Sequence, residues 1–507
     1  MNPNSNPGHS SQKYSSATRS RRLPRNFGVL ILLTMAQFLI LLDYTIVQVA
    51  LPSIERELGI TIGTVQWVVT AYGLTLAGFL LLSGRAGDFY GPKRLFIAGL
   101  VLFSLSSLAS GLAPTIAVLI VARAAQGIGG AMGSATGLSI LVATFPEGSE
   151  RNRALGIFGA VMGSAFIMGM ISGGIITTFL GWRWVFDVTV PIGLTAAALS
   201  ARLIQIPQTA AERRTGSLDF GGAIMATAGA VFFVYALTTL QVTGNTSLQP
   251  AGFLALSLLI FAGFVGVERR SNRPLLPLAF LRRRLVLVAN VIALLTVATF
   301  YGEVFLLTIY MQQVLNYSPL SAGLAFAPSG LVFFAVSGFF AAKFVNRAGV
   351  RLALIVGELL TVAGFVLLTQ ISASGSYLTV VLPATILSLF GLGFAFPAYS
   401  IAALMGARKG EEGLASGLLN TSRQLGAPVG IAILTTVATL LDPLAEPGAQ
   451  PYVGLVTGFD FAFVVAAALA GVTVFLACLI RAETRRVAKE LADALKSPES
   501  IPKSSTP

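Results

Sequence analysis

The chain has 507 residues and a formal net charge of +13, yet 55% of its residues are hydrophobic and only 11% are charged. Soluble domains average about 25% charged residues, so this composition excludes an ordinary soluble protein. A nucleic-acid-binding domain would gather its basic residues on one polar face. Here they lie in short segments between apolar stretches, so the charge predicts no nucleic-acid partner.

In chain order, a polar tail is followed by a series of apolar stretches and a second polar tail. A hydrocarbon core of about 30 Å needs roughly 20 apolar residues per helix, and fourteen stretches come near that length. They lie at residues 28–52, 63–83, 95–112, 115–142, 155–178, 185–203, 219–241, 251–268, 286–310, 320–342, 351–371, 377–403, 414–440 and 456–480. The sequence therefore predicts an all-α polytopic membrane protein with 14 transmembrane helices.

The basic residues predict its orientation. Thirty of the 34 Lys and Arg lie in the two tails and in every second gap between the stretches. Basic loops resist translocation and stay in the cytoplasm. We therefore expect a multi-pass protein of the cytoplasmic (plasma) membrane with both termini in the cytoplasm. The four arginines outside these segments are Arg56, Arg123, Arg183 and Arg423.

Two gaps resemble each other and indicate an internal repeat. Residues 84–94 read GRAGDFYGPKR, and residues 343–351 read KFVNRAGVR. A parallel repeat of two six-helix bundles places these gaps at equivalent positions if two helices are inserted between the bundles. The predicted parts are a tail at 1–26, a bundle at 27–205, the inserted helices with linkers at 206–284, a bundle at 285–482 and a tail at 483–507.

Glycines recur in two of the stretches at spacings that place several on one helix face. Small residues let the backbones of neighbouring membrane helices approach closely. The predicted packing glycines are Gly159, Gly163, Gly169, Gly173, Gly426 and Gly430.

The charged residues that fall inside apolar stretches include Asp43, Arg123, Glu303 and Glu358. A charge at the centre of a membrane helix costs roughly 2.5–3.5 kcal/mol on insertion scales. These side chains should therefore face a cavity or a partner. A structural ion pair or a hydrogen bond to a neighbouring helix is the alternative to a functional role for each of them.

The sequence also predicts the surroundings of Glu303 and the positions of several other polar and aromatic residues. Glu303 has Phe300, Tyr301 and Phe305 nearby in sequence, which suits a lipophilic cation because the rings add cation–π contacts. Asp187 and Asp460 are expected at solvated helix ends. The expected interfacial anchors are Trp182, Trp184 and Tyr317.

Five segments together resemble motifs of the fourteen-span drug:proton antiporters of the major facilitator superfamily. They are residues 42–52 (LDYTIVQVALP), 84–94, 123–127 (RAAQG), 181–186 (GWRWVF) and 415–426 (ASGLLNTSRQLG). The resemblance implies the fold of that superfamily and proton-coupled efflux of hydrophobic small molecules, cations among them, by alternating access. This sequence departs from the family pattern at Gln48, at Met170, where the family has proline, and at Asp187 and Thr189. Asp187 could mark a distinct substrate or ion site.

The resemblance also implies roles for individual residues. The expected proton-coupling residues are Asp43, Arg123, Glu303 and Glu358. The expected substrate cavity comprises Tyr44, Gln126, Tyr301, Glu303 and Phe305. The expected conformational latch, which holds one state of the transporter, comprises Gly84, Asp88, Gly91 and Arg94.

Some alternatives to drug efflux stay open, and others are excluded. A narrow exporter of one metabolite or antibiotic, or a nutrient or siderophore transporter of the same fold, fits the same pattern. A proton-pumping respiratory subunit would need lysines within the membrane, and all lysines lie in gaps or tails. With no phosphate-binding loop, a single His9 and a single Cys478, we expect no enzyme activity, cofactor or metal. The expected partners are a small-molecule substrate, protons and the lipid bilayer, and the expected oligomeric state is a monomer.

Overall fold

The protein is described by a computed structural model over residues 16–145, 149–204, 220–243, 248–270, 278–408, 411–440 and 453–480. Within these ranges the chain forms helices and turns without strands. Twelve helical segments there are long and apolar enough to cross a membrane, and two shorter apolar helices cover Ser164–Phe179 and Ile224–Leu240. The predicted all-α polytopic fold is confirmed, and the count of fourteen helices is supported approximately.

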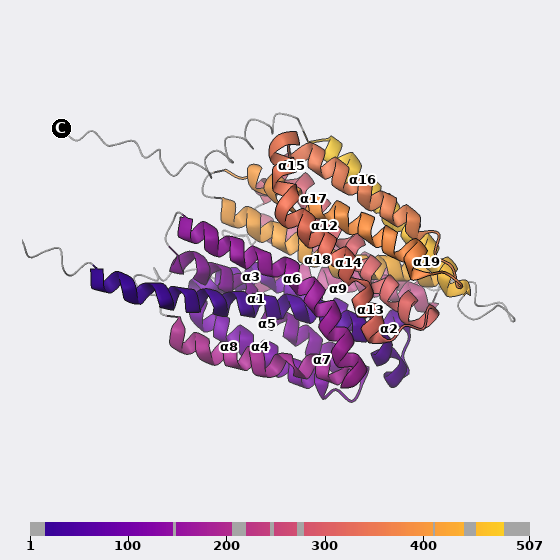
Figure 1. The fold of residues 1–507 in the computed structure, drawn as a ribbon, viewed down its shortest axis with the longest axis horizontal. Helices are drawn as coiled ribbons and strands as arrows, with labels where there is room; N and C mark the ends of the chain where they lie inside the picture. The colour runs from indigo at the N-terminus through magenta and orange to yellow at the C-terminus, as the bar shows by residue number, and fades with distance from the viewer. Residues whose placement is uncertain are drawn as a thin grey trace, which may run out of the picture.

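The helices form two groups with a pair between them (Figure 1). The first group is α1 (Ser16–Leu58), α2 (Ile62–Val65), α3 (Trp67–Tyr90), α4 (Pro92–Gly111), α5 (Ile116–Thr144), α6 (Ser149–Phe179), α7 (Arg183–Asp187) and α8 (Thr189–Leu203). The middle segment contains α9 (Phe220–Thr243), α10 (Gln249–Arg270) and α11 (Leu278–Leu281). The second group is α12 (Arg284–Ile309), η2 (Tyr310–Val314), α13 (Pro319–Ala325), α14 (Ala327–Ala335), η3 (Val336–Phe340), α15 (Ala341–Ala348), α16 (Val350–Leu368), η4 (Tyr377–Val381), α17 (Leu382–Met405), α18 (Glu412–Leu440) and α19 (Val453–Cys478).

The two groups repeat one packing pattern. In the first, α1 packs against α6, and α4 packs against α5 and α8. In the second, α12 packs against α18, and α16 packs against α17 and α19. Between the groups, α18 contacts α3, and α6 contacts α13 and α14. The equivalent helices α6 and α18 thus each bridge to the opposite group, as an internal repeat requires.

Two glycines end helices at the equivalent turns of this repeat. Gly91 follows α3 with φ +93°, and Gly349 follows α15 with φ +87°. A residue with a Cβ is strained at such φ values. The two similar gaps of the sequence therefore form the same kind of sharp turn before α4 and before α16. The helix α1 begins at Ser16, inside the stretch predicted to be a tail, and residues 481–507 lie outside the described part.

The predicted packing glycines mark close helix contacts. A Cβ on Gly173 would lie 2.5 Å from the carbonyl oxygen of Ile46, and one on Gly430 would lie 2.0 Å from the carbonyl oxygen of Ala298. Gly169 and Gly426 meet α1 and α12 in the same way. The surroundings of Gly159 and Gly163, both on α6, fall outside the described side chains. Close backbone approach thus joins α6 to α1 and α18 to α12.

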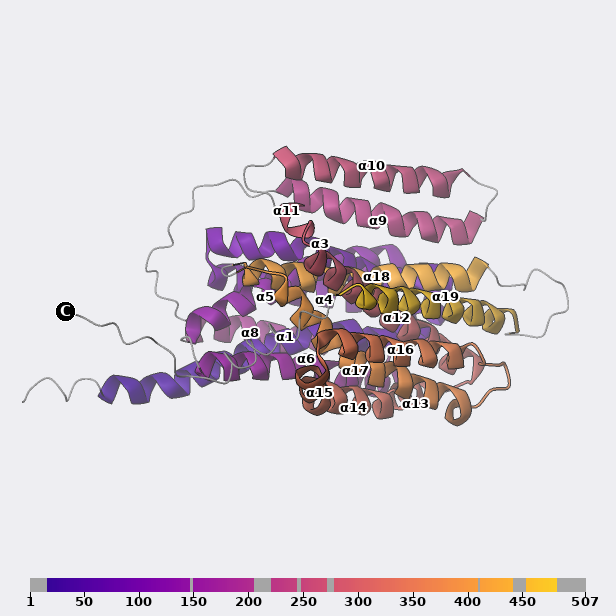
Figure 2. The ribbon, with the colours of Figure 1, turned by 90° about the horizontal axis from the view of Figure 1, so that it is seen from above.

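The inserted helices α9 and α10 pack against each other on one flank (Figure 2). Of the pair, α9 reaches the two groups, through α3 and α18, while α10 has most of its surface exposed. Neither helix contributes a residue to the cavity described below.

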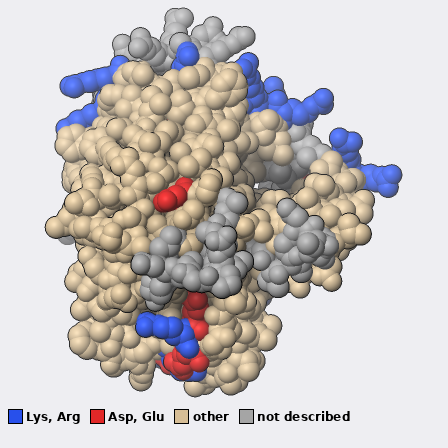
Figure 3. All heavy atoms as spheres, turned by 90° about the vertical axis from the view of Figure 1, so that its right-hand side faces the viewer, with Lys and Arg blue, Asp and Glu red and all other residues tan. Residues whose placement is uncertain are grey.

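The two ends of the bundle differ in charge. One end, called here the basic end, contains the turns at Gly91 and Gly349 and the residues Lys93, Arg94, Lys343, Arg347, Arg351 and Arg408. The opposite end contains the turn between α1 and α2 and the start of α13. Figure 3 shows that opposite end: its described surface is mostly tan, apart from basic groups at the rim, one acidic group near the middle and a small mixed group near the lower edge.

Candidate functional site

An ion pair lies fully buried inside the first group of helices. Nη1 of Arg123 on α5 donates to Oδ2 of Asp43 on α1 at 2.5 Å, and neither side chain has any exposed surface. Gln126, one turn along α5, donates to Oδ1 of Asp43 at 2.9 Å and accepts from Nη1 of Arg123 at 2.7 Å. Both carboxylate oxygens are therefore engaged.

Further contacts hold the arginine in place. Nε of Arg123 donates to the carbonyl oxygen of Val68 at 2.8 Å, and its guanidinium lies over the ring of Tyr72 at 4.3 Å. Gln126 also donates to Ser107 at 3.1 Å. A buried ion pair persists only when such extra bonds offset the loss of hydration. This network thus stabilises two charges far from either membrane surface.

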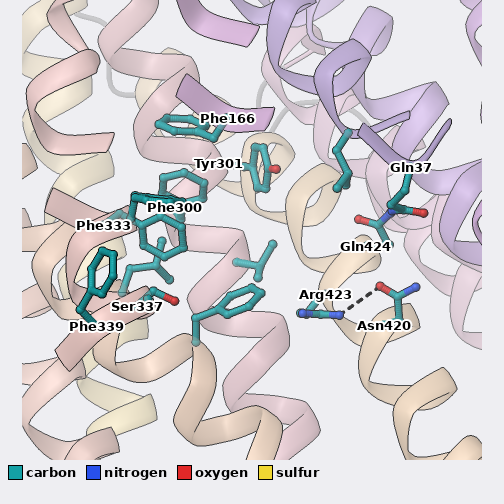
Figure 4. Close-up of a pocket in the computed structure, with 16 residues that line it drawn as sticks. Gln37, Phe166, Phe300, Tyr301, Phe333, Ser337, Phe339, Asn420, Arg423 and Gln424 are labelled. Carbon is teal, nitrogen blue, oxygen red and sulfur yellow. Dashed lines mark hydrogen bonds between the residues drawn. The ribbon is translucent and has the colours of Figure 1, made fainter. Parts of the chain in front are cut away.

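A cavity of about 380 Å³ lies between the two groups, most of it formed by the second. Its lining combines aromatic and aliphatic side chains with a few polar ones (Figure 4). The lining residues are Gln37, Leu41, Phe166, Val297, Phe300, Tyr301, Phe333, Phe334, Ser337, Gly338, Phe339, Leu392, Phe396, Asn420, Arg423 and Gln424.

Apolar and polar side chains occupy different walls of this cavity. In Figure 4 the labelled phenylalanines gather on one side, whereas Gln37, Gln424, Asn420 and Arg423 lie on the other. Asn420, Arg423 and Gln424 are on α18, and Gln37 is on α1. An elongated molecule with an apolar body and one polar end would match both walls.

A short series of tyrosines connects the cavity to the buried ion pair. Tyr301 lines the cavity and meets the ring of Tyr44 with 4.8 Å between centroids. Tyr44 in turn lies 5.8 Å from the ring of Tyr72, over which Arg123 stacks. Tyr44 also follows Asp43 directly in α1, so a continuous series of contacts joins the cavity wall to the ion pair.

Glu303 and Glu358, the two acids expected inside the second group, are buried away from the cavity lining. Glu303 on α12 accepts a hydrogen bond from Ser388 on α17 at 2.7 Å, and Glu358 on α16 accepts one from Thr296 on α12 at 2.5 Å. Each is 1% exposed or less. Neither belongs to the salt bridges found among the described residues, which pair Arg123, Arg183 and Arg283 with other acids.

The residues expected to form a substrate cavity are thus distributed over three places. Tyr301 lies on the lining, and Tyr44 touches it from behind. Gln126 belongs to the ion-pair network. Glu303 and Phe305 are buried in the helix packing and do not line the cavity.

The expected latch residues lie at the basic end. Gly84 is on α3 with open space beside it, Gly91 forms the turn, and Arg94 is exposed on α4. Beside them, Lys93 donates to the carbonyl oxygen of Ala201 at the end of α8, at 2.8 Å. The side chain of Asp88 lies outside the described part, so its role as a latch stays a prediction.

Asp187 and Asp460 differ from the solvated helix ends that we expected. Each has one carboxylate oxygen that is covered by protein and lacks a hydrogen-bond partner within the described residues. Asp187 packs against Gly111, where a Cβ would lie 2.2 Å from its Oδ1. The close approach of α7 to α4 covers this group, an effect that sequence position alone does not reveal.

Sequence reasoning missed Arg423, the one charged side chain on the cavity lining. A signal was present, because Arg423 is one of only four arginines outside the tails and basic gaps. It lies within an apolar stretch, so its charge needs a cavity or a partner just as Asp43 does. Asn420 and Gln424 lie with Arg423 in the motif at residues 415–426, whereas Gln37 carried no comparable signal.

The two groups of helices meet closely at the opposite end. Gln312 donates to the carbonyl oxygen of Val49 at 2.8 Å, and Gln313 donates to Glu55 at 2.8 Å. The backbone N–H of Leu320 donates to Thr178 at 3.1 Å. These bonds join α1 and α6 of the first group to η2 and α13 of the second.

Comparison with known proteins finds one matching family model and several relatives. The sequence model of the Major Facilitator Superfamily matches residues 33–431. The puromycin resistance protein pur8 of Streptomyces alboniger is 36% identical over 487 residues, which cover 94% of this chain and 95% of that protein. The cephamycin export protein CmcT of Amycolatopsis lactamdurans is 36% identical over 409 residues, which cover 80% of this chain and 84% of that protein.

A solved structure shows the same fold at low sequence identity. It is a bacterial homologue of the human lysosomal transporter Spinster in an inward-facing, unoccupied conformation. The superposition has a TM-score of 0.63 at 16% identity and covers 90% of this chain and 97% of that one.

Proposed function

Because the chain belongs to the major facilitator superfamily, we propose that it exports hydrophobic small molecules across the cytoplasmic membrane in exchange for protons. The related resistance and export proteins support the direction of transport. The cavity between the two helix groups supports a central binding site, and the two groups rock about it to expose it alternately to either side of the membrane.

The observation that carries the proton coupling is the fully buried pair of Asp43 and Arg123. Arginine stays charged at any working pH, so it stays paired with the carboxylate of Asp43 until a rearrangement pulls the two apart. When a rearrangement separates them, an isolated carboxylate in low dielectric takes up a proton. Binding in the cavity would act on the pair through Tyr301 and Tyr44.

Glu303 is a second candidate for coupling, because it occupies the equivalent place in the other group. Asp43 on α1 is bonded to α5, and Glu303 on α12 is bonded to Ser388 on α17, which corresponds to α5 in the repeat. Glu303 has a hydroxyl partner where Asp43 has a cation. Glu358, bonded to Thr296, is the third candidate.

The test is proton flux in proteoliposomes that hold a pH-sensitive dye. Puromycin and a cephamycin, compounds named in the relatives, are added separately under an imposed pH gradient. We expect the wild-type protein to release protons when a transported compound is added. Asp43→Asn should abolish this release while still exchanging labelled compound between the two sides, since exchange needs no net proton movement.

The matched control is Glu57→Gln, which removes an acid from an exposed ion pair at the opposite end. This variant should keep both proton release and exchange. Proton release that persists in Asp43→Asn would reject Asp43 as the coupling site, and Glu303→Gln and Glu358→Gln would then be compared. Transport of either compound without proton movement in the wild-type protein would reject antiport.

A narrower exporter is the second candidate, because the relatives are named for single antibiotics. The two readings differ in the range of transported compounds. A protein that moves one compound of a structurally varied panel and ignores the rest is a narrow exporter.

A further inference from the structure

We propose that the cavity selects amphipathic anions, molecules with an aromatic body and a single carboxylate that binds Arg423. The inference rests on the proposed transport function and adds the chemical class of its substrate. It differs from the lipophilic cation that the sequence led us to expect beside Glu303.

Arg423 supplies the only formal charge among the described residues that line the cavity. Among the described residues it forms no salt bridge, its guanidinium lies 5.1 Å from the ring centre of Phe396, and it donates to Asn420 at 3.3 Å. The described lining of the cavity therefore carries one positively charged group and no negatively charged one. The planar fork of donors matches a carboxylate in a two-bond arrangement.

The acids of the membrane interior do not offset this charge. Asp43 is engaged by Arg123, and Glu303 and Glu358 accept bonds from Ser388 and Thr296. All three are 1% exposed or less and none lines the cavity. A cationic ligand would therefore meet a like charge at Arg423 and no available counter-charge, whereas an anionic ligand would pair with it.

The walls of the cavity favour the rest of such a molecule. Phe300, Phe333 and Phe339 lie across the cavity from Arg423, and Gln424 and Gln37 lie on the same side as the arginine (Figure 4). Aromatic rings bury large apolar areas and stack on other rings. An aromatic body would lie against the phenylalanines with its acid group reaching α18.

The experiment measures binding to the purified full-length protein by isothermal titration with three probes that share one body. They are naphthaleneacetate, its primary amide and naphthylethylamine. We expect the acid to bind roughly 10- to 100-fold more tightly than the amide, the ratio typical of a hydrogen bond to a charged group, and the amine to bind most weakly. Arg423→Gln should make the affinities for acid and amide about equal, because it weakens binding of the acid roughly 10- to 100-fold more than binding of the amide.

The control variant is Arg347→Gln, which removes one exposed positive charge at the basic end and should preserve the preference for the acid. Thermal unfolding of Arg423→Gln in detergent, without any probe, shows whether the variant is folded like the wild-type protein. A preference for the amine, equal binding of all three probes, or an acid preference that survives Arg423→Gln would overturn the inference.

Transport of the same probes in proteoliposomes separates the two proposals. Transport that favours the amine rejects only the anion preference, whereas acid-selective binding without transport rejects only the exporter.

Discussion

Asp43 and Arg123 are each buried without any exposed surface, and each depends on the other. The loss of hydration on burying either charge is several kcal/mol, and it is offset by their contact and by the bonds to Gln126 and Val68. Arg423, in contrast, faces a cavity and has no acid partner among the described residues. Arginine is thus paired with a buried acid in one helix group and faces a cavity in the other.

Because Asp43 and Arg123 depend on each other, removing one of the two charges should cause a large loss of stability, and removing both should cost less than the sum of the two single losses. Asp43→Asn leaves Arg123 buried without a counter-charge and should destabilise the protein by about 3–5 kcal/mol. The double variant Asp43→Asn with Arg123→Gln should lose less than the sum of the two single changes, because it leaves no isolated charge. Thermal unfolding in detergent measures both effects.

The exposed pair of Glu57 and Arg183 is the matched control for this prediction. Its side chains are 50% and 38% exposed, so Glu57→Gln should change stability by about 0–1 kcal/mol. Equal losses for the buried and the exposed pair would contradict the idea that burial makes the Asp43 contact essential.

The ion pair of Arg283 and Glu411 predicts how the stability of the protein changes at acid pH. Bonds from the guanidinium of Arg283 and from the backbone N–H of Arg408 lower the pKa of Glu411 from its ordinary 4.5 to about 2. A carboxyl with a lowered pKa in the folded state stabilises the fold above pH 4.5, and this contribution is lost as the pH falls toward 2. Glu411→Gln should therefore remove part of the decline in melting temperature between pH 4.5 and 2. An identical decline in both proteins would reject this role for Glu411, which joins the start of α12 to the start of α18.

At the scale of helices, the contact between α12 and α18 is both tightly packed and next to the cavity. Both helices contribute to the cavity, through Tyr301 and Arg423, and their backbones approach closely at Gly430. The carbonyl oxygen of Ala298 leaves no room for a Cβ there, and neither backbone can yield without moving a whole helix. Packing of these glycines thus sets the position of two cavity walls.

Gly430→Ala should therefore separate α12 from α18 and destabilise the protein by roughly 1–3 kcal/mol, the usual cost of overpacking. Unfolding in detergent measures the loss. The control is Gly471→Ala on α19, where a Cβ meets nothing within 4 Å. Because alanine favours helices over glycine, this control should be neutral or stabilising by up to about 1 kcal/mol. A neutral Gly430→Ala would show that the two helices adjust freely.

At the scale of the whole molecule, the two groups of helices are joined at the opposite end by bonds between α1 or α6 and the segment η2–α13. The cavity lies nearer the basic end, since its lining includes η3 and the first half of α18. Transport by alternating access requires the bonds at the opposite end to break in each cycle.

A reversible cross-link tests this requirement. Thr178→Cys and Leu320→Cys, combined with Cys478→Ser to remove the native thiol, place two thiols where α6 meets α13. Joining them with a short cross-linker should reduce transport in proteoliposomes to less than about a tenth of its rate, because the opposite end can no longer open. Cleaving a reducible linker should restore transport, and each single-cysteine variant should be unaffected. Full transport while cross-linked would show that this end need not separate.

Much of the architecture follows from local sequence. Apolar length predicts membrane helices, alternating basic gaps predict their direction, and the similar gaps before α4 and α16 predict the repeat seen in the turns at Gly91 and Gly349. The glycine spacing predicted close packing on α6 and α18, and Gly173 and Gly430 show it. These properties depend on periodicity and on residues near one another in the chain, which a sequence displays directly.

What the sequence could not determine is which buried charge faces which partner. Asp43, Glu303, Glu358 and Arg423 all read as charges inside apolar stretches, and only the fold pairs the first with Arg123 and turns the last toward the cavity. The contacts that separate these roles join residues about 60 to 90 positions apart on different helices. The face that a helix presents depends on its rotation against its neighbours, and that rotation is set by packing across the whole molecule. The sequence by itself thus determined the membrane fold and its repeat, whereas the tertiary structure alone decided the charge and the walls of the cavity.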